Sequence, residues 1–256
     1  MQTKKIIIGN WKMNPISLKE GERLFKEISK NLPRLKKTKV VICPPFLYIE
    51  KLKKLAKRIQ LGAQNVCGAD AGPYTGEVAG GMLYDAGVRY VIVGHSERRA
   101  RGEENEEINK KIKVALSESI TPILCVGENV RDEMDESHQY FNIVKTQLEE
   151  CLVGISKSSI ADIIIAYEPV WAISTTVNRR DATAADCLEM VIFIRKILAD
   201  KFGSDASKVK IIYGGSANEK DAREFLEHGG VDGLLPGRAS LDAKKFVQII
   251  KIAESI

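Results

Sequence analysis

Ile163-Ile164-Ile165-Ala166-Tyr167-Glu168-Pro169 is the stretch that best indicates how this chain folds. A run of five apolar residues is typical of a strand that is buried on both faces. Pro169 has a restricted φ and no N–H to donate, so the strand ends there. Glu168 therefore stands at the end of a buried strand, where it can face a solvent-accessible mouth. Taken alone, such a glutamate is more often an ion-pair partner than a catalyst.

Similar short apolar runs recur along the chain and alternate with stretches of helical period. The other runs are Ile6–Ile8, Val40–Cys43, Leu61–Ala63, Tyr90–Val93, Ile123–Val126, Val209–Tyr213 and Val231–Leu235. Helical period is clear in Gly21–Ile28, Ile108–Leu116, Asp186–Leu198 and Ala243–Ile252. The unit thus recurs eight times at roughly thirty-residue spacing, and its strands must pair in parallel through right-handed crossovers. We predict an α/β fold in which residues 1–256 form one domain, a closed (β/α)8 barrel. An open doubly wound sheet remains the alternative, because periodicity does not show closure.

Composition and charge exclude several classes of protein. Apolar residues make up 44% and charged residues 29%, values typical of a soluble protein with a sizeable core. The chain has neither an apolar stretch of about 18 residues nor a signal-peptide pattern, so we expect no membrane association. The five cysteines are scattered, which indicates neither a disulfide framework nor a zinc site and favours the cytoplasm.

The formal net charge of +5 lies largely in amphipathic helix patterns. We interpret these charges as solvated helix faces rather than a nucleic-acid surface, since no aromatic residues alternate with them. A mild positive field would still attract a small anionic substrate.

Polar residues are concentrated where strands of such a barrel end, which is where these barrels carry their chemistry. The segments concerned are Gly9–Asn14, Gly94–Arg99, Glu168, Gly214–Ser216 and Pro236–Ser240.

Four of these segments resemble the signature segments of triosephosphate isomerase. They are Asn10-Trp11-Lys12-Met13-Asn14, Gly94-His95-Ser96-Glu97-Arg98-Arg99, Ala166-Tyr167-Glu168-Pro169-Val170-Trp171-Ala172-Ile173 and Tyr213-Gly214-Gly215-Ser216. The resemblance keeps the family's order and spacing from Asn10 to Leu241. It implies a TIM barrel enzyme of glycolysis and gluconeogenesis that interconverts D-glyceraldehyde 3-phosphate and dihydroxyacetone phosphate. It further implies a cytoplasmic homodimer, with a tetramer as the alternative, and no metal and no organic cofactor.

The predicted reaction needs a base and a group that stabilises the resulting enediolate oxygen. Glu168 is the candidate base, and His95, at the start of a helical turn, is the candidate neutral donor to the oxyanion. This pair is the family's known assignment and is carried over from it. Lys12 supplies an ammonium group that can balance both the phosphate and the developing charge.

Further residues are expected to support these three. By similarity, Asn10 lines the same pocket and Glu97 positions the lysine ammonium. Ile173 and Leu235 would exclude water and make the base more basic.

The phosphate site is expected in two glycine-containing loops. Gly214-Gly215-Ser216 would bring main-chain N–H groups close to an anion. Gly237 and Arg238 would open a helix whose free N–H groups favour an oxyanion, and the Ser174 N–H would reach the phosphate. The alternative is that each glycine merely serves a tight turn.

Two segments differ from the family pattern. The lid, Ser174 to Asp181, is about three residues longer than usual, which could let more of the intermediate escape to methylglyoxal. In the eighth loop Pro236 and Arg238 replace the usual residues, and we predict a negative φ at Arg238.

A loop and two histidines complete the predictions. Residues 69–77 resemble the family's dimer loop, in which Thr75 would support Asn10 and His95 of the neighbouring subunit. His138 and His228 lie in helical stretches and are expected at the surface.

Two other functions remain alternatives from the sequence. Another phosphate-binding barrel enzyme would not need Glu168, His95 and Lys12 together. A non-catalytic barrel that acts as a binding protein would have lost at least one of them.

Overall fold

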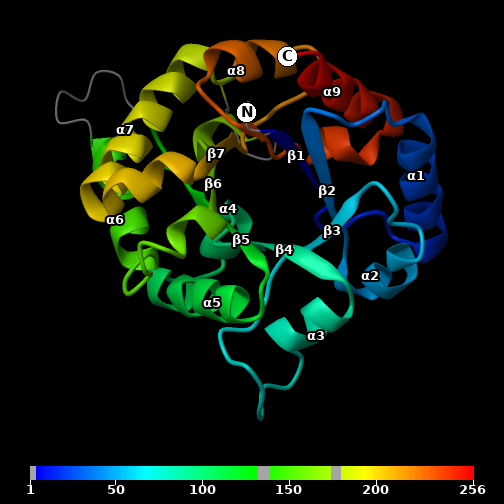
Figure 1. Ribbon diagram of the computed structural model, residues 1–256, viewed down its shortest axis with the longest axis horizontal. Helices are drawn as coiled ribbons and strands as arrows, with labels where there is room; N and C mark the ends of the chain where they lie inside the picture. The colour runs from blue at the N-terminus through cyan, green and yellow to red at the C-terminus, as the bar shows by residue number, and fades with distance from the viewer. Residues whose placement is uncertain (1–3, 132–138, 174–179) are drawn as a thin grey trace.

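The computed structural model describes residues 4–131, 139–173 and 180–256 and shows a closed barrel of eight parallel strands. Figure 1 looks along the barrel, with the strands around the centre and the helices outside them. The strands are β1 (Lys5–Asn10), β2 (Thr38–Cys43), β3 (Gln60–Ala63), β4 (Val88–Val93), β5 (Thr121–Val126), β6 (Ile164–Tyr167), β7 (Lys210–Tyr213) and β8 (Gly233–Leu234).

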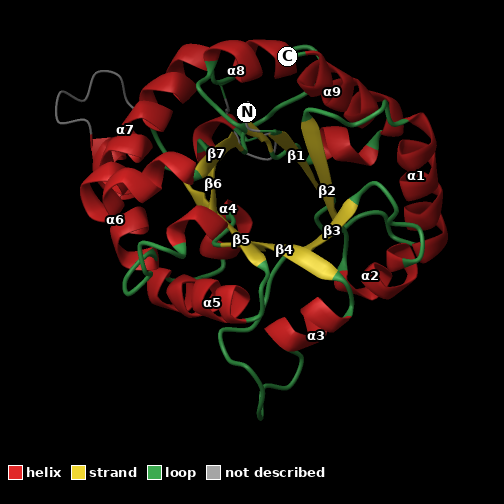
Figure 2. Ribbon diagram, viewed as in Figure 1, coloured by secondary structure: helices red, strands yellow, loops and turns green. Residues whose placement is uncertain are grey.

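Helices, which Figure 2 shows in red, connect the strands; most of them form the outer layer, whereas α4 lies further in, near the strands. They are α1 (Leu18–Asn31), α2 (Phe46–Lys53), α3 (Gly80–Asp85), α4 (Ser96–Arg99), α5 (Asn105–Ser117), α6 (Gln139–Cys151), α7 (Ala184–Phe202), α8 (Ala222–His228) and α9 (Ala243–Ser255). The short 3-10 helices are η1 (Ile160–Asp162), η2 (Val170–Ala172), η3 (Gly203–Lys208) and η4 (Arg238–Leu241). Across the described ranges, no helix is both long and apolar enough to cross a membrane.

The first and last strands pair with each other, which closes the barrel. Ile6 lies opposite Gly233 and Ile7 opposite Leu234, so the sheet continues from β8 back to β1. Closure leaves no room for a side chain at position 233, because a Cβ there would lie 1.9 Å from the Ile6 carbonyl oxygen. The prediction of a closed barrel is confirmed, and the open-sheet alternative is wrong.

The strands are apolar throughout because both of their faces are buried. Along β1, Ile6 and Ile8 point into the barrel and Ile7 packs in the layer between the barrel and the helices. This double burial explains why the strands appear as continuous apolar runs rather than as alternating patterns.

The last strand is shorter than its apolar run. The pattern Val231–Leu235 predicts five residues, whereas β8 spans Gly233–Leu234. The flanking N–H groups of Asp232 and Leu235 donate to the carbonyls of Ile211 and Tyr213, and the Asp232 carbonyl accepts from the Ile6 N–H, so the hydrogen bonding continues beyond the two residues of β8. His228 is exposed at the end of α8, as predicted. His138 lies outside the described residues.

Candidate active site

The structure brings ten of the predicted site residues together around one cavity of about 510 Å³ at the carboxyl ends of the strands. They are Asn10, Lys12, His95, Ile173, Gly214, Gly215, Ser216, Leu235, Gly237 and Arg238. The strands position these residues because parallel strands all end at the same rim of a barrel. Which chemical role each residue has stays a prediction.

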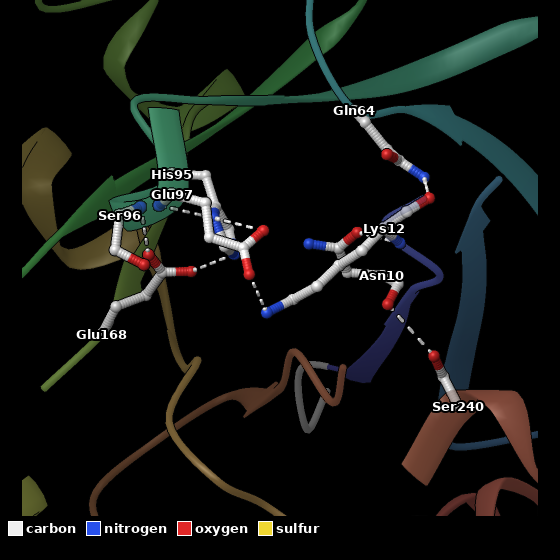
Figure 3. A network of polar contacts seen from close by, with 8 residues as sticks. All are labelled: Asn10, Lys12, Gln64, His95, Ser96, Glu97, Glu168 and Ser240. Atoms are coloured by element: carbon white, nitrogen blue, oxygen red, sulfur yellow. Dashed lines mark hydrogen bonds and ion pairs between the residues drawn. The ribbon is translucent and has the colours of Figure 1, made fainter. Parts of the chain in front are cut away.

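Lys12 is held in an unusual backbone conformation at the mouth of the barrel. Its φ is +52°, a left-handed value that costs a non-glycine residue about 1–2 kcal/mol. Hydrogen bonds on both sides maintain it: its N–H donates to Asn10 Oδ1 (3.0 Å), and its carbonyl accepts from Gln64 Nε2 (2.8 Å). Figure 3 shows these contacts, together with the hydrogen bond from the Ser240 hydroxyl to the Asn10 carbonyl. The backbone thus aims the lysine side chain across the cavity.

The Lys12 ammonium group pairs with Glu97. The distance from Lys12 Nζ to Glu97 Oε1 is 2.7 Å, and both side chains are partly exposed. Burial alone would raise the pKa of Glu97, but the hydrogen bond and charge of Lys12, with a smaller effect of the Arg101 charge, lower it. Glu97 is therefore ionised at neutral pH and suited to position the ammonium group.

His95 is buried, with its two ring nitrogens in different roles. Nδ1 accepts a hydrogen bond from the Glu97 N–H (3.2 Å), and Nε2 lies 3.2 Å from Glu168 Oε1. A nitrogen that accepts from an N–H carries a lone pair, so this contact fits a ring tautomer with its proton on Nε2. The ring can thus donate from Nε2.

Glu168 does not face the cavity. Its side chain is 2% exposed, and Oε2 accepts from the Ser96 N–H at 3.0 Å. Oε1 is close to His95 but has no hydrogen-bond partner among the described residues, so the 3.2 Å contact is poorly aligned. Figure 3 shows the His95 ring between the Glu168 carboxylate and the Lys12 side chain.

The resting position of Glu168 differs from the expected one, and two neighbours explain it. The Ser96 N–H at the start of α4 makes a charge-assisted hydrogen bond with the carboxylate. Gly214 leaves space for the side chain, since a Cβ there would lie 2.8 Å from Glu168 Cγ. The carboxylate consequently lines a smaller hollow of about 270 Å³, beside Ser96, Cys125 and Gly127.

The two glycine loops differ from each other. The Gly214 N–H donates to the Tyr167 carbonyl (2.7 Å), so the expectation that it faces an anion is wrong. Gly237 precedes η4, and a Cβ there would lie 3.4 Å from Lys12 Cε. Arg238 begins η4 and has no positive φ, which confirms the predicted sign.

Thr75 and Ser174 are also among the predicted site residues. Thr75 belongs to the loop between β3 and α3, whose residues 70–77 are all exposed and which projects from the barrel in Figure 1. Ser174 lies outside the described residues, as does most of the longer lid. Trp171 precedes that segment and Arg180 follows it, and the Arg180 guanidinium lies 4.5 Å from the centre of the Trp171 ring.

Sequence reasoning missed three residues that hold the site together. Gln64 supports Lys12, and the Ser240 hydroxyl donates to the carbonyls of Asn10 and Gly237. Glu128, fully buried, accepts from the Tyr167 hydroxyl and from Trp171 Nε1, both at 2.8 Å. Gln64 and Glu128 could have been found, because each is a polar residue just after a strand, and Ser240 lies in the segment Pro236–Ser240 that the sequence had singled out without giving it a role.

No metal site is evident in the parts of the chain that the structure describes. There, no group of three His, Cys, Asp or Glu side chains is arranged to hold an ion.

Comparison with known proteins gives a consistent result. A family model described as triosephosphate isomerase matches residues 5–253. The triosephosphate isomerase of Dehalococcoides mccartyi is 44% identical over 98% of both chains, and that of Alkaliphilus oremlandii is 39% identical over 96% of this chain and 98% of the relative. The crystal structure of triosephosphate isomerase from Bartonella henselae matches with a TM-score of 0.81 and 34% identity. It covers 97% of this chain and 98% of the other.

Proposed function

This chain belongs to the triosephosphate isomerase family and is an isomerase of triose phosphates, and from that premise we propose how its residues carry out the reaction. The substrates are D-glyceraldehyde 3-phosphate and dihydroxyacetone phosphate, which interconvert through an enediolate. Residues 1–256 act as one catalytic domain without a cofactor. The arrangement of Lys12, His95 and Glu168 around one rim carries this proposal.

The phosphate group binds at the end of the cavity formed by Gly215, Ser216, Gly237 and Arg238. Main-chain N–H groups in these loops and at the start of η4 suit an oxyanion. With the phosphate there, the carbonyl end of the substrate extends toward Lys12 and His95, which line the same cavity.

The substrate carbonyl oxygen then accepts a hydrogen bond from His95 Nε2. The ring is already neutral and held through Nδ1, so no reorganisation is needed as charge develops on the oxygen. The Lys12 ammonium group adds a positive charge that stabilises the enediolate. Its ion pair with Glu97 keeps it in place.

Glu168 has to rotate before it can act as base. It must exchange the Ser96 hydrogen bond for contact with the substrate carbon, and a hydrogen bond to a charged group contributes about 1.5–3 kcal/mol. Substrate binding energy has to supply this amount. Rotation also releases His95 Nε2 from its contact with the carboxylate. The base therefore engages only when the cavity is filled.

We also propose that the active form is a cytoplasmic homodimer that binds neither nucleic acid nor membranes. Support comes from exposed apolar residues, with Leu47 88% exposed, Met13 85% and Tyr74 51%. Where such side chains gather in one contiguous patch, they are typical of a surface that a partner covers. In such a dimer Thr75 would reach the neighbouring site.

Replacing Glu168 by glutamine tests the base. Glutamine keeps the shape but accepts no proton, so kcat should fall by about 10²–10⁴ with little change in KM. Glu168→Asp, which withdraws the carboxylate by about 1 Å, should cost on the order of a hundredfold. Glu27→Gln, on an exposed part of α1, serves as the control.

Deuterium incorporation tests the enediolate separately. In D2O, abstraction and return of a proton places deuterium on the carbon next to the carbonyl, whereas a direct hydride shift places none. Product without deuterium, or a Glu168→Gln enzyme with more than a tenth of the wild-type rate, would contradict the mechanism.

A further inference from the structure

A second concave region lies at the amino-terminal ends of the strands, opposite the active site. A hollow of about 470 Å³ is lined by Lys4, by Lys39 of β2, by residues between α2 and β3, and by Arg89 of β4. An adjoining hollow of about 230 Å³ shares Lys4 and Lys39 with the first. Together they form what we call the basic hollow, whose cations are Lys4, Lys39, Lys53, Lys57, Arg58, Arg89, Lys208 and Lys210.

The basic hollow accounts for the positive charge of the whole chain. Its described lining holds eight of the 39 lysines and arginines but, among the 34 acidic residues, only Asp162. The rest of the chain therefore carries slightly more acid than base, although the net charge is +5. The interpretation of the positive charges as solvated helix faces is incomplete, because the excess is gathered at one end of the barrel.

Three of these cations are held rigidly by the carboxyl-terminal ends of helices. Arg58 donates to the Ser29 carbonyl (2.7 Å) and Lys53 to the Asp85 carbonyl (2.8 Å), while Arg89 donates to the Tyr84 carbonyl (3.0 Å). Carbonyl partners order a side chain but leave its formal charge uncompensated. Helix capping thus explains the position of three cations and builds a fixed positive rim.

Capping does not explain Lys4, Lys39 and Lys57. All three are exposed, and none of their ammonium groups has a carboxylate partner among the residues that the structure describes. Lys39 Nζ lies 5.8 Å from the centre of the Tyr90 ring, a contact that also leaves its charge uncompensated. These three lysines line the same hollow as the three cations that the helix ends hold.

Like charges at this end of the barrel act on one another. The pKa of Lys210 is lowered first by burial and further by the positive charges of Lys39 and Lys5, while Asp232 opposes these effects. An anion bound between the lysines would relieve this repulsion. Low-dielectric walls around the hollow would strengthen the attraction.

We propose that the basic hollow binds a short chain of phosphoryl groups, either a free oligophosphate or the triphosphate of a nucleotide. Cations on several sides match several negative charges in a row, and the volume suits a small ligand. Recognition is of the phosphates alone. The tyrosine that lines the hollow, Tyr90, is 6% exposed and offers no face on which a base could stack.

Calorimetric titration of the full-length protein with sodium tripolyphosphate tests the proposal. Glycerol 3-phosphate, which has no carbonyl to isomerise, is present throughout to fill the active site. The double variant Lys39→Glu/Lys57→Glu should weaken tripolyphosphate binding at least tenfold. Lys113→Glu/Lys196→Glu, which makes the same charge change at exposed positions of α5 and α7, should alter it by less than twofold.

Isomerase activity shows that the variants are folded, and kcat/KM should stay within twofold of wild type in both. ATP should bind like tripolyphosphate, and adenosine should not bind. Three results would each overturn the proposal: equal losses in the two double variants, no binding of tripolyphosphate while glycerol 3-phosphate fills the active site, or adenosine binding as tight as that of ATP.

Discussion

Glu128 provides the sharpest test of how the site is supported, because one buried oxygen of its carboxyl group serves two donors. Oε1 accepts from the Tyr167 hydroxyl and from Trp171 Nε1, and Oε2 has no partner among the described residues. Tyr167 precedes the proposed base, and Trp171 lies in η2. Replacing Glu128 by alanine removes the acceptor from both.

The expected loss follows from the two donors. Each buried donor left unsatisfied costs about 1–3 kcal/mol, so Glu128→Ala should lower the free energy of unfolding by about 2–6 kcal/mol. That is a large share of the roughly 5–15 kcal/mol by which proteins are stable. Glu128→Gln keeps the Oε1 acceptor and should cost less than about 1 kcal/mol.

The pH dependence of the glutamine variant has a definite sign. Burial raises the pKa of Glu128 more than the bonds from Trp171 and Tyr167 and the charge of Arg131 lower it. The folded protein therefore keeps this proton to a higher pH than the unfolded chain, so wild-type stability falls as pH rises above the unfolded pKa of about 4.3. Glutamine has no such proton, so the free energy of unfolding of the variant should rise relative to that of wild type from pH 4 to pH 7.

Urea unfolding of wild type, Glu128→Ala and Glu128→Gln at several pH values measures both effects. If glutamine destabilises the protein as much as alanine does, the shared acceptor is not what matters. A constant difference between wild type and the glutamine variant across this pH range would refute the titration argument.

Two further predictions concern the surroundings of the site. Gln147 holds Gly127, which packs against the backbone of Glu168, through bonds to its N–H (2.8 Å) and carbonyl (3.0 Å). Gln147→Leu should therefore lower the free energy of unfolding by about 2–6 kcal/mol and lower kcat more than it raises KM. Urea unfolding and steady-state kinetics check these two effects. An unchanged kcat would limit Gln147 to a structural role. Sedimentation velocity should give twice the mass of one 28.4 kDa chain for wild type, and Tyr74→Glu should shift it toward monomers with lower activity; a fully active wild-type monomer would contradict the dimer.

The barrel was predictable because burial on both faces leaves a simple signature. Each strand appears as a short apolar run, and the predicted run Ile163–Tyr167 differs from β6 by a single residue. Closure was harder, because it depends on pairing between residues far apart, such as Ile6 with Gly233. The lack of a side chain at Gly233 lets β8 lie against Ile6 of β1. The sequence does not say that these two strands are neighbours, so this fit could be recognised only in the structure.

The membership of the site was also largely predictable. In a parallel barrel every strand ends at one rim, so a polar residue just after a strand is placed there by topology alone. Asn10, Lys12 and His95 were found in this way. Gln64 and Glu128 were missed although they carry the same signal after β3 and β5.

The orientation of Glu168 could not be predicted, because a strand end positions a Cα but does not select a rotamer. Its rotamer depends on the Ser96 N–H, 72 residues away in sequence, and on the space left by Gly214. Neither contact produces a periodic pattern. The same holds for the left-handed backbone of Lys12, which depends on Gln64 from another strand end. Contacts of this kind join residues that are far apart in the sequence, so sequence predicts which groups meet at the rim better than it predicts how they rest there.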